Sequence, residues 1–444
     1  MAVEGLSAAA HVLDSRLQTR DGKIGIIGLG YVGLPLGVEF ARVGFPVVGF
    51  DVDPVRVDAI NRGESYTGDV DKASLSDLIK RGRLQAFHEF DLLTHTDVVV
   101  ICVQTPFTAT KEPDLSYVVA ALEEIRRHLH PGQLIVLQST TYPGTTEEVA
   151  LPILAASGLR VGTDFFLSFS PERVDPGNAR FSTRDIPKVV GGITPTCTRL
   201  TRRLFEQVVT HVYPVSSARA AELTKLLENV FRSVNIALVN ELAQLCDRMG
   251  MNVWEVVEAA STKPFGFMAF QPGPGVGGHC IPVDPYYLSW KAKEFDFNTK
   301  FIALAAEINE NMPYYVAERV TEVVNVRARR SIADARLLIL GVAYKRNVAD
   351  VRESPALKVL ERLQRRGADI AFHDPYVNSI RLNGNEYSSL ELTADEISKA
   401  DCVVILTDHL GIDYQWVVAQ ARLVFDTRNA IKEVGAGLTK VIRL

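Results

Sequence analysis

Residues 23–33, with the sequence KIGIIGLGYVG, decide the fold of the amino-terminal part of the chain. A short apolar run ends in a G-x-G-x-x-G pattern, a helical stretch follows to Val43, and a second apolar run ends at Asp51. Strand, glycine turn, helix and strand in this order form the first unit of a doubly wound parallel sheet. The segment therefore predicts an α/β domain of the Rossmann type.

The three glycines of this pattern predict a cofactor site. Gly28 permits the tight turn, Gly30 lets a pyrophosphate approach the backbone, and Gly33 lets the helix pack on the strand. Asp51 follows about 20 residues later, where a carboxylate accepts a hydrogen bond from the ribose 2′-OH and repels a 2′-phosphate. This favours NAD over NADP, although Arg56 argues the other way, and glycines that serve only a tight turn are the alternative. The loop between the glycines adds two contact candidates, Tyr31 and Val32.

The domain organisation follows from the same periodicity. Apolar runs at 97–103 and 134–137 each follow a helix-like segment, which predicts a doubly wound sheet in a domain of residues 1–212. Residues 218–249 contain no Gly or Pro, so we expect one long helix within an all-helical central domain of residues 213–330. Its apolar stripe consists of Leu223, Leu227, Val230, Val234, Leu238, Leu242 and Leu245.

An internal repeat begins after Arg330. A strand at 335–341, a helix at 355–366 and a strand ending at Asp374 repeat the opening order, but residues 341–346, GVAYKR, replace the glycine turn. We therefore predict a second Rossmann-like domain at 331–444 with different phosphate chemistry. The fold class is α/β, with two Rossmann-like doubly wound domains joined by a central all-helical domain with one long helix.

Composition excludes several functional classes. The chain has 444 residues, 47% of them hydrophobic, and a formal net charge of −5, so no bulk positive charge attracts nucleic acid or an anionic membrane. No apolar run approaches the roughly 18 residues that a membrane helix needs. Five cysteines without C-x-x-C spacing argue against a disulfide framework and a metal site, and favour a cytoplasmic location. We expect residues 1–20 to be a frayed leader rather than a secretory signal.

Two segments carry candidate chemistry. Residues 273–284, GPGVGGHCIPVD, place Cys280 in a thin glycine-rich loop, where its thiol is either a nucleophile or a chance loop cysteine. Lys225 and Asn229 share one face of the long helix, where a solvated helix face is the alternative. Glu172 and Thr140 follow the apolar runs 165–169 and 134–137, at the strand ends where α/β sheets present ligand-binding groups.

Taken together, these motifs resemble the nucleotide-sugar 6-dehydrogenases, the UDP-glucose and GDP-mannose dehydrogenase superfamily. The resemblance rests on GLGYVG, SPER, AELTKLLEN, GPGVGGHCIPVDP, GVAYKRNVADVRESPAL and FDTRN, in this order along the chain. The segment from Pro264 to Glu294 is most similar to the branch that oxidises UDP-N-acetylglucosamine. The resemblance implies NAD at the first domain, a UDP-sugar held largely by the third, and a central helix that pairs subunits into a homodimer or a higher homo-oligomer.

The resemblance also implies roles for individual residues. Cys280 becomes the nucleophile, Lys225 and Asn229 stabilise the oxyanion, Asp284 with Thr140 holds water or relays protons, and Glu172 assists thioester hydrolysis. Further cofactor contacts are implied for Thr105, Thr140 and Arg352. Substrate contacts are implied for Glu172, Arg173, Val174, Lys225, Asn229, Phe270, Gly275, Gly277, Tyr344, Lys345 and Arg428.

Two departures from the UDP-glucose enzymes bear on the substrate. Those enzymes usually have lysine where this chain has Val283, and an acidic residue where it has Pro176, beside Asp175. The family's substrate-binding arginine from a partner subunit has no clear counterpart near Lys263. The sequence therefore favours UDP-N-acetylglucosamine, with UDP-glucose, UDP-N-acetylmannosamine and UDP-N-acetylgalactosamine as alternatives. A two-electron hydroxyacid or 6-phosphogluconate-type dehydrogenase and a non-catalytic NAD-binding protein are alternatives from other classes.

Overall fold

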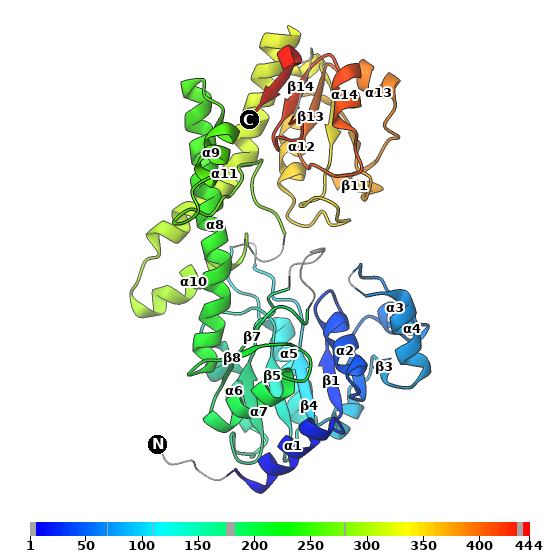
Figure 1. The fold of residues 1–444 in the computed structure, drawn as a ribbon, viewed down its shortest axis with the longest axis vertical. Helices are drawn as coiled ribbons and strands as arrows, with labels where there is room; N and C mark the ends of the chain where they lie inside the picture. Colours follow the sequence, from blue (N-terminus) through cyan, green and yellow to red (C-terminus); the bar gives the residue numbers. More distant parts are fainter. Residues whose placement is uncertain (1–5, 69, 109, 175–182, 279–280, 433–437) are drawn as a thin grey trace. The chain divides into compact units, whose positions relative to one another are not determined.

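The computed structural model describes residues 6–68, 70–108, 110–174, 183–278, 281–432 and 438–444 (Figure 1). It divides into two compact units, Met1–Glu228 with Trp290–Phe295, and Asn229–Ser289 with Asp296–Leu444. Helix α8 (Ala218–Met249) contributes to both units and has 32 residues, which confirms the predicted long helix. No helix in the described part of the chain is long and apolar enough to cross a membrane.

The first unit is built on an eight-stranded sheet in the order β3-β2-β1-β4-β5-β6-β7-β8. Pairing is parallel from β3 to β6, as predicted, whereas β7 runs antiparallel to β6. The strands are β1 (Ile24–Ile27), β2 (Val47–Phe50), β3 (Leu84–Phe87), β4 (Val98–Ile101), β5 (Leu134–Leu137), β6 (Phe166–Phe169), β7 (Lys188–Gly192) and β8 (Val212–Pro214). The helices are α1 (Ala8–Thr19), α2 (Gly33–Arg42), α3 (Pro54–Asn61), α4 (Lys72–Lys80), α5 (Ser116–His128), α6 (Leu151–Ala155) and α7 (Pro195–Phe205).

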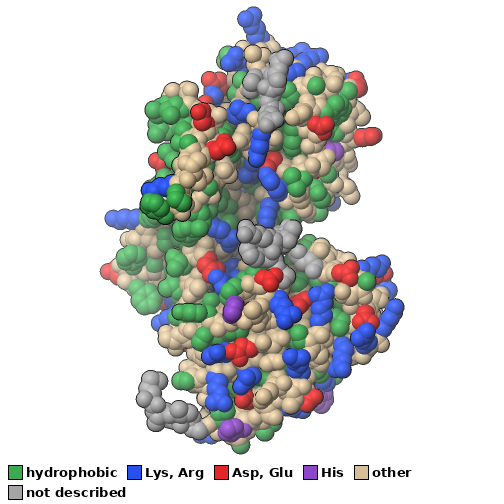
Figure 2. All heavy atoms as spheres, viewed as in Figure 1, with side chains coloured by type: hydrophobic (Ala, Val, Ile, Leu, Met, Phe, Trp, Pro, Cys, Tyr) green, Lys and Arg blue, Asp and Glu red, His purple; other side chains and the backbone are tan. Residues whose placement is uncertain are grey.

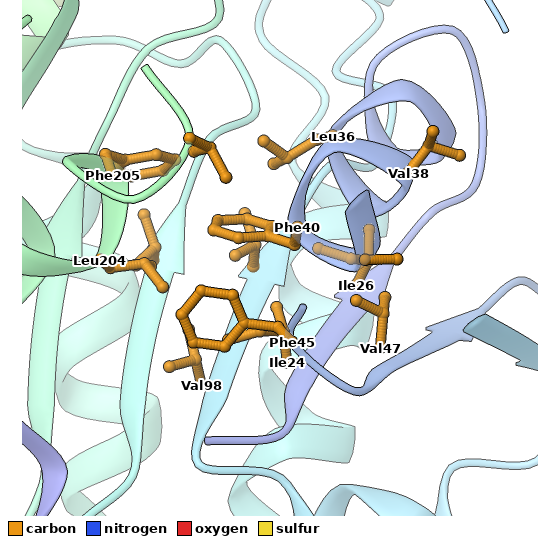
Figure 3. Close-up of a cluster of buried hydrophobic side chains, with 14 of the residues drawn as sticks. Ile24, Ile26, Leu36, Val38, Phe40, Phe45, Val47, Val98, Leu204 and Phe205 are labelled. Atoms are coloured by element: carbon orange, nitrogen blue, oxygen red, sulfur yellow. The ribbon is translucent and has the colours of Figure 1, made fainter. Parts of the chain in front are cut away.

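Aromatic packing fixes helix α2 on this sheet (Figure 3). Phe40 of α2 is fully buried, with its ring centroid 5.8 Å from that of Phe45 and 6.1 Å from that of Phe205 on α7. Strands β1, β4 and β5 are buried at every position, as expected for parallel strands covered on both faces. This core holds the glycine turn at the carboxyl end of β1.

The amino-terminal residues correct one expectation. Residues 8–19 form helix α1 rather than a frayed leader. Its buried residues Ala10, Leu13 and Leu17 recur at helical spacing, and Asp14 forms an ion pair with Arg203 of α7 at 3.2 Å. Burial of this short apolar stripe against α7 accounts for the difference, because an isolated helix of this length is marginal in water.

The second unit contains a five-stranded parallel sheet in the order β10-β9-β13-β14-β15 and an antiparallel hairpin. The sheet strands are β9 (Arg336–Leu340), β10 (Asp369–His373), β13 (Cys402–Ile405), β14 (Val424–Asp426) and β15 (Val441–Arg443), and the hairpin consists of β11 (Ser379–Leu382) and β12 (Asn385–Ser388). The remaining helices are α9 (Val253–Ser261), α10 (Asp284–Ala292), α11 (Lys300–Val323), α12 (Pro355–Arg365), α13 (Ala394–Lys399) and α14 (Tyr414–Gln420). The predicted fold class is confirmed.

The two sheets share one local design at their first strands. Gly28 after β1 has φ +89°, and a Cβ there would lie 2.6 Å from the Cys102 carbonyl oxygen. Gly341 after β9 has φ +80°, and a Cβ there would lie 2.3 Å from the Thr407 carbonyl oxygen. The predicted internal repeat is therefore present at the backbone level, since both turns pass directly over the neighbouring strand.

Candidate active site

The glycine turn of the first unit separates packing from ligand approach. A Cβ at Gly33 would lie 1.9 Å from the Gly28 carbonyl oxygen, so Gly33 is required by the fold itself. A Cβ at Gly30 would meet no described atom within 4 Å. A glycine that only served the turn would be needed for local packing, whereas Gly30 leaves open space at the start of α2. The residues present therefore fit a bound pyrophosphate, which a helix amino terminus attracts.

Asp51 lies at the carboxyl end of β2, where the ribose of a dinucleotide binds. It is 5% exposed, and its Oδ2 accepts a hydrogen bond from the Leu29 N–H at 2.8 Å. Arg56 lies 3.5 Å from the same oxygen. Tyr66, which the sequence did not indicate, donates its hydroxyl to the Leu29 carbonyl, and burial raises the pKa of that phenol. Asp51 is thus held by the glycine turn itself.

A second group of polar side chains lies where β5 and β6 end. Both oxygens of the Glu172 carboxylate are occupied: Oε1 accepts from the Arg173 and Val174 N–H groups at 2.8 Å, and Oε2 accepts from Gln138 and from Lys188, the latter at 2.8 Å. The Arg173 guanidinium pairs with Glu228 of α8 at 2.7 Å. Thr140 lies half-buried in the loop after β5. The sequence placed Glu172 at this edge but gave no sign of Lys188.

Helix α8 presents a buried polar face within the first unit. Glu222 is fully buried and accepts hydrogen bonds from the Gly144 N–H at 2.6 Å and the Thr146 N–H at 2.8 Å, while burial raises its pKa to about 7. One turn later Lys225 is only 7% exposed. Among the described residues its ammonium has no carboxylate within ion-pair distance. The solvated-face alternative is therefore wrong for Lys225, which is a buried cation available to an anionic group.

Asn229 and Asp284 lie together in the second unit, as the sequence reading requires. Asn229 is fully buried, and its amide nitrogen donates to the Asp284 carboxylate, which is 2% exposed at the start of α10. The amide oxygen of Asn229 accepts from Arg232. The amide orientation is thus fixed from both ends by charged partners.

The glycine-rich segment before Cys280 is anchored by buried amides. The Gly273 N–H donates to the Asn240 side-chain oxygen at 3.0 Å, and Asn240 donates to Asn309 of α11 at 2.9 Å. A Cβ at Gly277 would lie 2.8 Å from the Glu353 carbonyl oxygen and from the Tyr344 Cβ. The predicted contact residues Gly275, Gly277 and Tyr344 therefore lie within one packed region. His279 and Cys280 lie outside the described residues.

A pocket of about 360 Å³ opens at the carboxyl ends of β9, β13 and β14. Arg428 lines it, with Arg346 and Lys432 as further cations. Burial, together with the neighbouring Arg346, lowers the pKa of Arg428 to about 10. Trp254 and Tyr414 add aromatic surface. Cations beside aromatic rings suit a nucleoside diphosphate, whose phosphates and base these groups bind respectively.

The other predicted contact residues do not line this pocket. Phe270 packs edge-on against Phe231 with centroids 5.8 Å apart, and Arg352 forms an ion pair with Asp350 at 2.8 Å. Lys345 is partly buried. Arg346 was visible in the sequence as part of the cationic loop, whereas Trp254, Gln138 and Asn309 carried no local signal.

Comparison with known proteins places this geometry in a family. Residues 22–209, 219–311 and 338–433 match, respectively, the NAD binding, central and UDP binding domains of the UDP-glucose/GDP-mannose dehydrogenase family. The chain is 36% identical over 422 residues to UDP-N-acetyl-D-mannosamine dehydrogenase of Pyrococcus horikoshii, covering 94% of this chain and 97% of the relative. It is 37% identical over 362 residues to UDP-N-acetyl-D-glucosamine 6-dehydrogenase of Pseudomonas aeruginosa, covering 81% and 84%.

A solved structure agrees with the sequence matches. The structure of the UDP-D-ManNAc dehydrogenase of Pyrococcus horikoshii has a TM-score of 0.85 and 34% identity to this chain, covering 95% of this chain and 98% of that one. The first unit thus contains the family's NAD-binding domain, and the pocket lies in the unit that contains its UDP-binding domain. The chain belongs to the UDP-glucose/GDP-mannose dehydrogenase family and is an NAD-dependent oxidoreductase of UDP-sugars.

Proposed function

We propose that this protein oxidises C6 of UDP-N-acetyl-D-glucosamine to the carboxylate in two successive two-electron steps, giving UDP-N-acetyl-D-glucosaminuronic acid. The observation that carries the proposal is the buried Lys225 ammonium without a counter-ion, one turn from the Asn229–Asp284 pair. A cation and an amide on one helix face suit an alkoxide that forms during oxidation. Relatives named for N-acetylated UDP-sugars support the substrate class.

The chemistry assigns a task to each side chain. Bound at the glycine turn, NAD accepts one hydride from C6 in each of the two oxidations. Lys225 and Asn229 stabilise the alkoxide, and the Cys280 thiolate adds to the aldehyde to give a thiohemiacetal. Loss of the second hydride leaves a thioester, which water cleaves with help from Glu172. Asp284, with Thr140, fixes water or a proton along this path.

The proposed cofactor and substrate contacts follow the geometry. Gly28, Gly30, Gly33 and Asp51 would hold NAD, with Arg56 beside the ribose. The pocket with Arg346, Arg428 and Lys432 would bind the diphosphate, because guanidinium groups match phosphate oxygens in pairs. Arg346 and Lys432 therefore join the substrate-binding residues predicted from the sequence.

NADH stoichiometry on a panel of purified UDP-sugars tests the function. We expect two NADH per sugar consumed and the highest kcat/KM with UDP-N-acetylglucosamine, measured by absorbance with the product acid quantified separately. Higher turnover of UDP-N-acetylmannosamine, UDP-N-acetylgalactosamine or UDP-glucose would reassign the sugar but keep the chemistry. One NADH per sugar with accumulated aldehyde would instead favour a two-electron dehydrogenase.

We also propose that the protein is a homodimer paired through α8. Six large apolar side chains of this helix are exposed between 36% and 63%: Leu223, Leu227, Phe231, Leu238, Leu242 and Leu245. Figure 2 shows hydrophobic side chains gathered over the helical part of the chain. Five of the seven stripe residues predicted from the sequence thus face outward, and Val230 is the buried exception. A stripe of this kind is typical of an oligomer interface.

Leu238→Glu tests this interface. Placing a carboxylate on the 56% exposed Leu238 should raise the dimer dissociation constant at least about 100-fold, because an unpaired charge would be buried in the interface. Sedimentation velocity over a concentration series measures the effect. Val12→Glu, at a 61% exposed site on α1, is the matched control. A wild-type protein that is monomeric at micromolar concentration would contradict the proposal.

A further inference from the structure

A buried lysine lies against the Glu172 carboxylate. Lys188, the first residue of β7, is 2% exposed, and its Nζ donates to Glu172 Oε2 at 2.8 Å and to the Pro171 carbonyl at 3.4 Å. The ammonium also lies 5.3 Å from the Phe205 ring centroid. A charged group in such surroundings requires a partner of opposite sign. Glu172 is the only carboxylate within ion-pair distance of Lys188 among the described residues.

The remaining contacts orient the carboxylate. Gln138, which follows β5, donates to the same oxygen as Lys188, and the N–H groups of Arg173 and Val174 donate to the other. The four donors come from three separate segments, the ends of β5 and β6 and the start of β7. Neither oxygen is therefore free to rotate away from this edge of the sheet.

We propose that Lys188 is a positioning residue for Glu172, which keeps that carboxylate ionised and fixed for the water-dependent release of the product acid. The inference rests on the proposed function, in which Glu172 assists thioester hydrolysis. In that step the water oxygen bonds to C6 as the C6–S bond breaks. One proton of the water passes through Glu172 to the leaving sulfur, and the other dissociates from the acid product.

The charges around Glu172 give the sign of the pH effect. Burial alone raises the pKa of Glu172, but Lys188 and the backbone N–H groups outweigh it, so the pKa is lowered. The neighbouring Cys102 thiol is neutral because burial raises its pKa, and Arg173 is paired with Glu228. Removing the Lys188 charge leaves burial less opposed, so the pKa of Glu172 rises. Hydrolysis then fails at pH values where the wild-type carboxylate is still ionised.

Lys188→Met with pre-steady-state kinetics tests the inference. We expect the acid limb of the kcat profile to move up by at least about one pH unit, which lowers kcat roughly 10-fold at pH 6 while KM changes little. At that pH a burst of two NADH per active site should precede slow turnover, and at pH 9 the rate should approach that of wild type. Lys188→Arg, which keeps the charge, should restore the acid limb.

Two further variants separate the possible failures. Lys291→Met is the matched control, because Lys291 is equally buried and pairs with Glu148 and Glu294 instead; its pH profile should not move. Glu172→Gln should slow hydrolysis at every pH. An unshifted acid limb in Lys188→Met, with slow hydrolysis in Glu172→Gln, overturns the inference and leaves the proposed function intact. Normal hydrolysis in Glu172→Gln overturns both the inference and the role of Glu172. Should the methionine variant not fold, Lys188→Gln gives the same comparison.

Discussion

Replacing Cys280 with serine is expected to lower formation of the uronic acid at least about 10³-fold, the scale seen when a covalent nucleophile is removed. A serine hydroxyl is a much weaker nucleophile than a thiolate near neutral pH, so the aldehyde would not be captured efficiently. The first hydride transfer does not need the thiol. NADH formed per sugar should therefore fall from two to about one, with the aldehyde trapped by a carbonyl reagent.

Cys246→Ser is the matched control for this experiment. Cys246 is a free, buried cysteine on α8 with no part in the proposed chemistry, so its variant should keep two NADH per sugar. Equal rates of acid formation in wild type and Cys280→Ser would remove the thioester route and revive a two-electron mechanism. Mass spectrometry of the wild-type enzyme quenched during turnover provides a second check, since the thioester adds the mass of the sugar nucleotide to the peptide that contains Cys280.

Gly33→Ala is expected to destabilise the protein by about 3 kcal/mol and to abolish NAD binding. A Cβ at this position would lie 1.9 Å from the Gly28 carbonyl oxygen, so α2 or the glycine turn must move. Either movement displaces the helix amino terminus from the pyrophosphate. Denaturant unfolding measures the first effect, and isothermal titration with NAD measures the second.

Gly30→Ala separates binding from folding at the same turn. Because a Cβ at Gly30 meets no described atom within 4 Å, the free energy of unfolding should change by less than about 1 kcal/mol. NAD affinity should nevertheless fall roughly 10-fold or more, since the new methyl group occupies the path of the pyrophosphate. Equal loss of stability in the two variants would contradict the assignment of Gly30 to the ligand.

Sequence reasoning succeeds here where chemistry depends on short spacing. The glycine turn with Asp51 lies within about 30 residues of one βαβ unit, and its geometry follows from strand and helix periods. Lys225 and Asn229 share a face because they are four residues apart on a helix. The repeat at Gly341 and Asp374 was visible for the same reason, because its elements recur in the same order.

Contacts that depend on tertiary structure were not predictable. Lys188 meets Glu172 only because β7 turns back antiparallel to β6, a pairing that no local pattern announces. Helix α1 was misread because its three buried residues form a weak stripe until α7 covers them. The stripe on α8 was read correctly as helical, but periodicity cannot tell whether such a face packs inside the subunit or faces outward.

The carboxylate of the second repeat shows how such a duplication has diverged. Asp374 stands where Asp51 does, but its Oδ2 accepts from the Val342 and Ala343 N–H groups and from the buried His409 at 3.0 Å. His409 in turn accepts from the Asn347 N–H through Nδ1, so its proton lies on Nε2, toward Asp374. A redesign that merely grafted G-x-G-x-x-G onto residues 341–346 would gain no ribose receptor, because that acid already serves as an internal rivet.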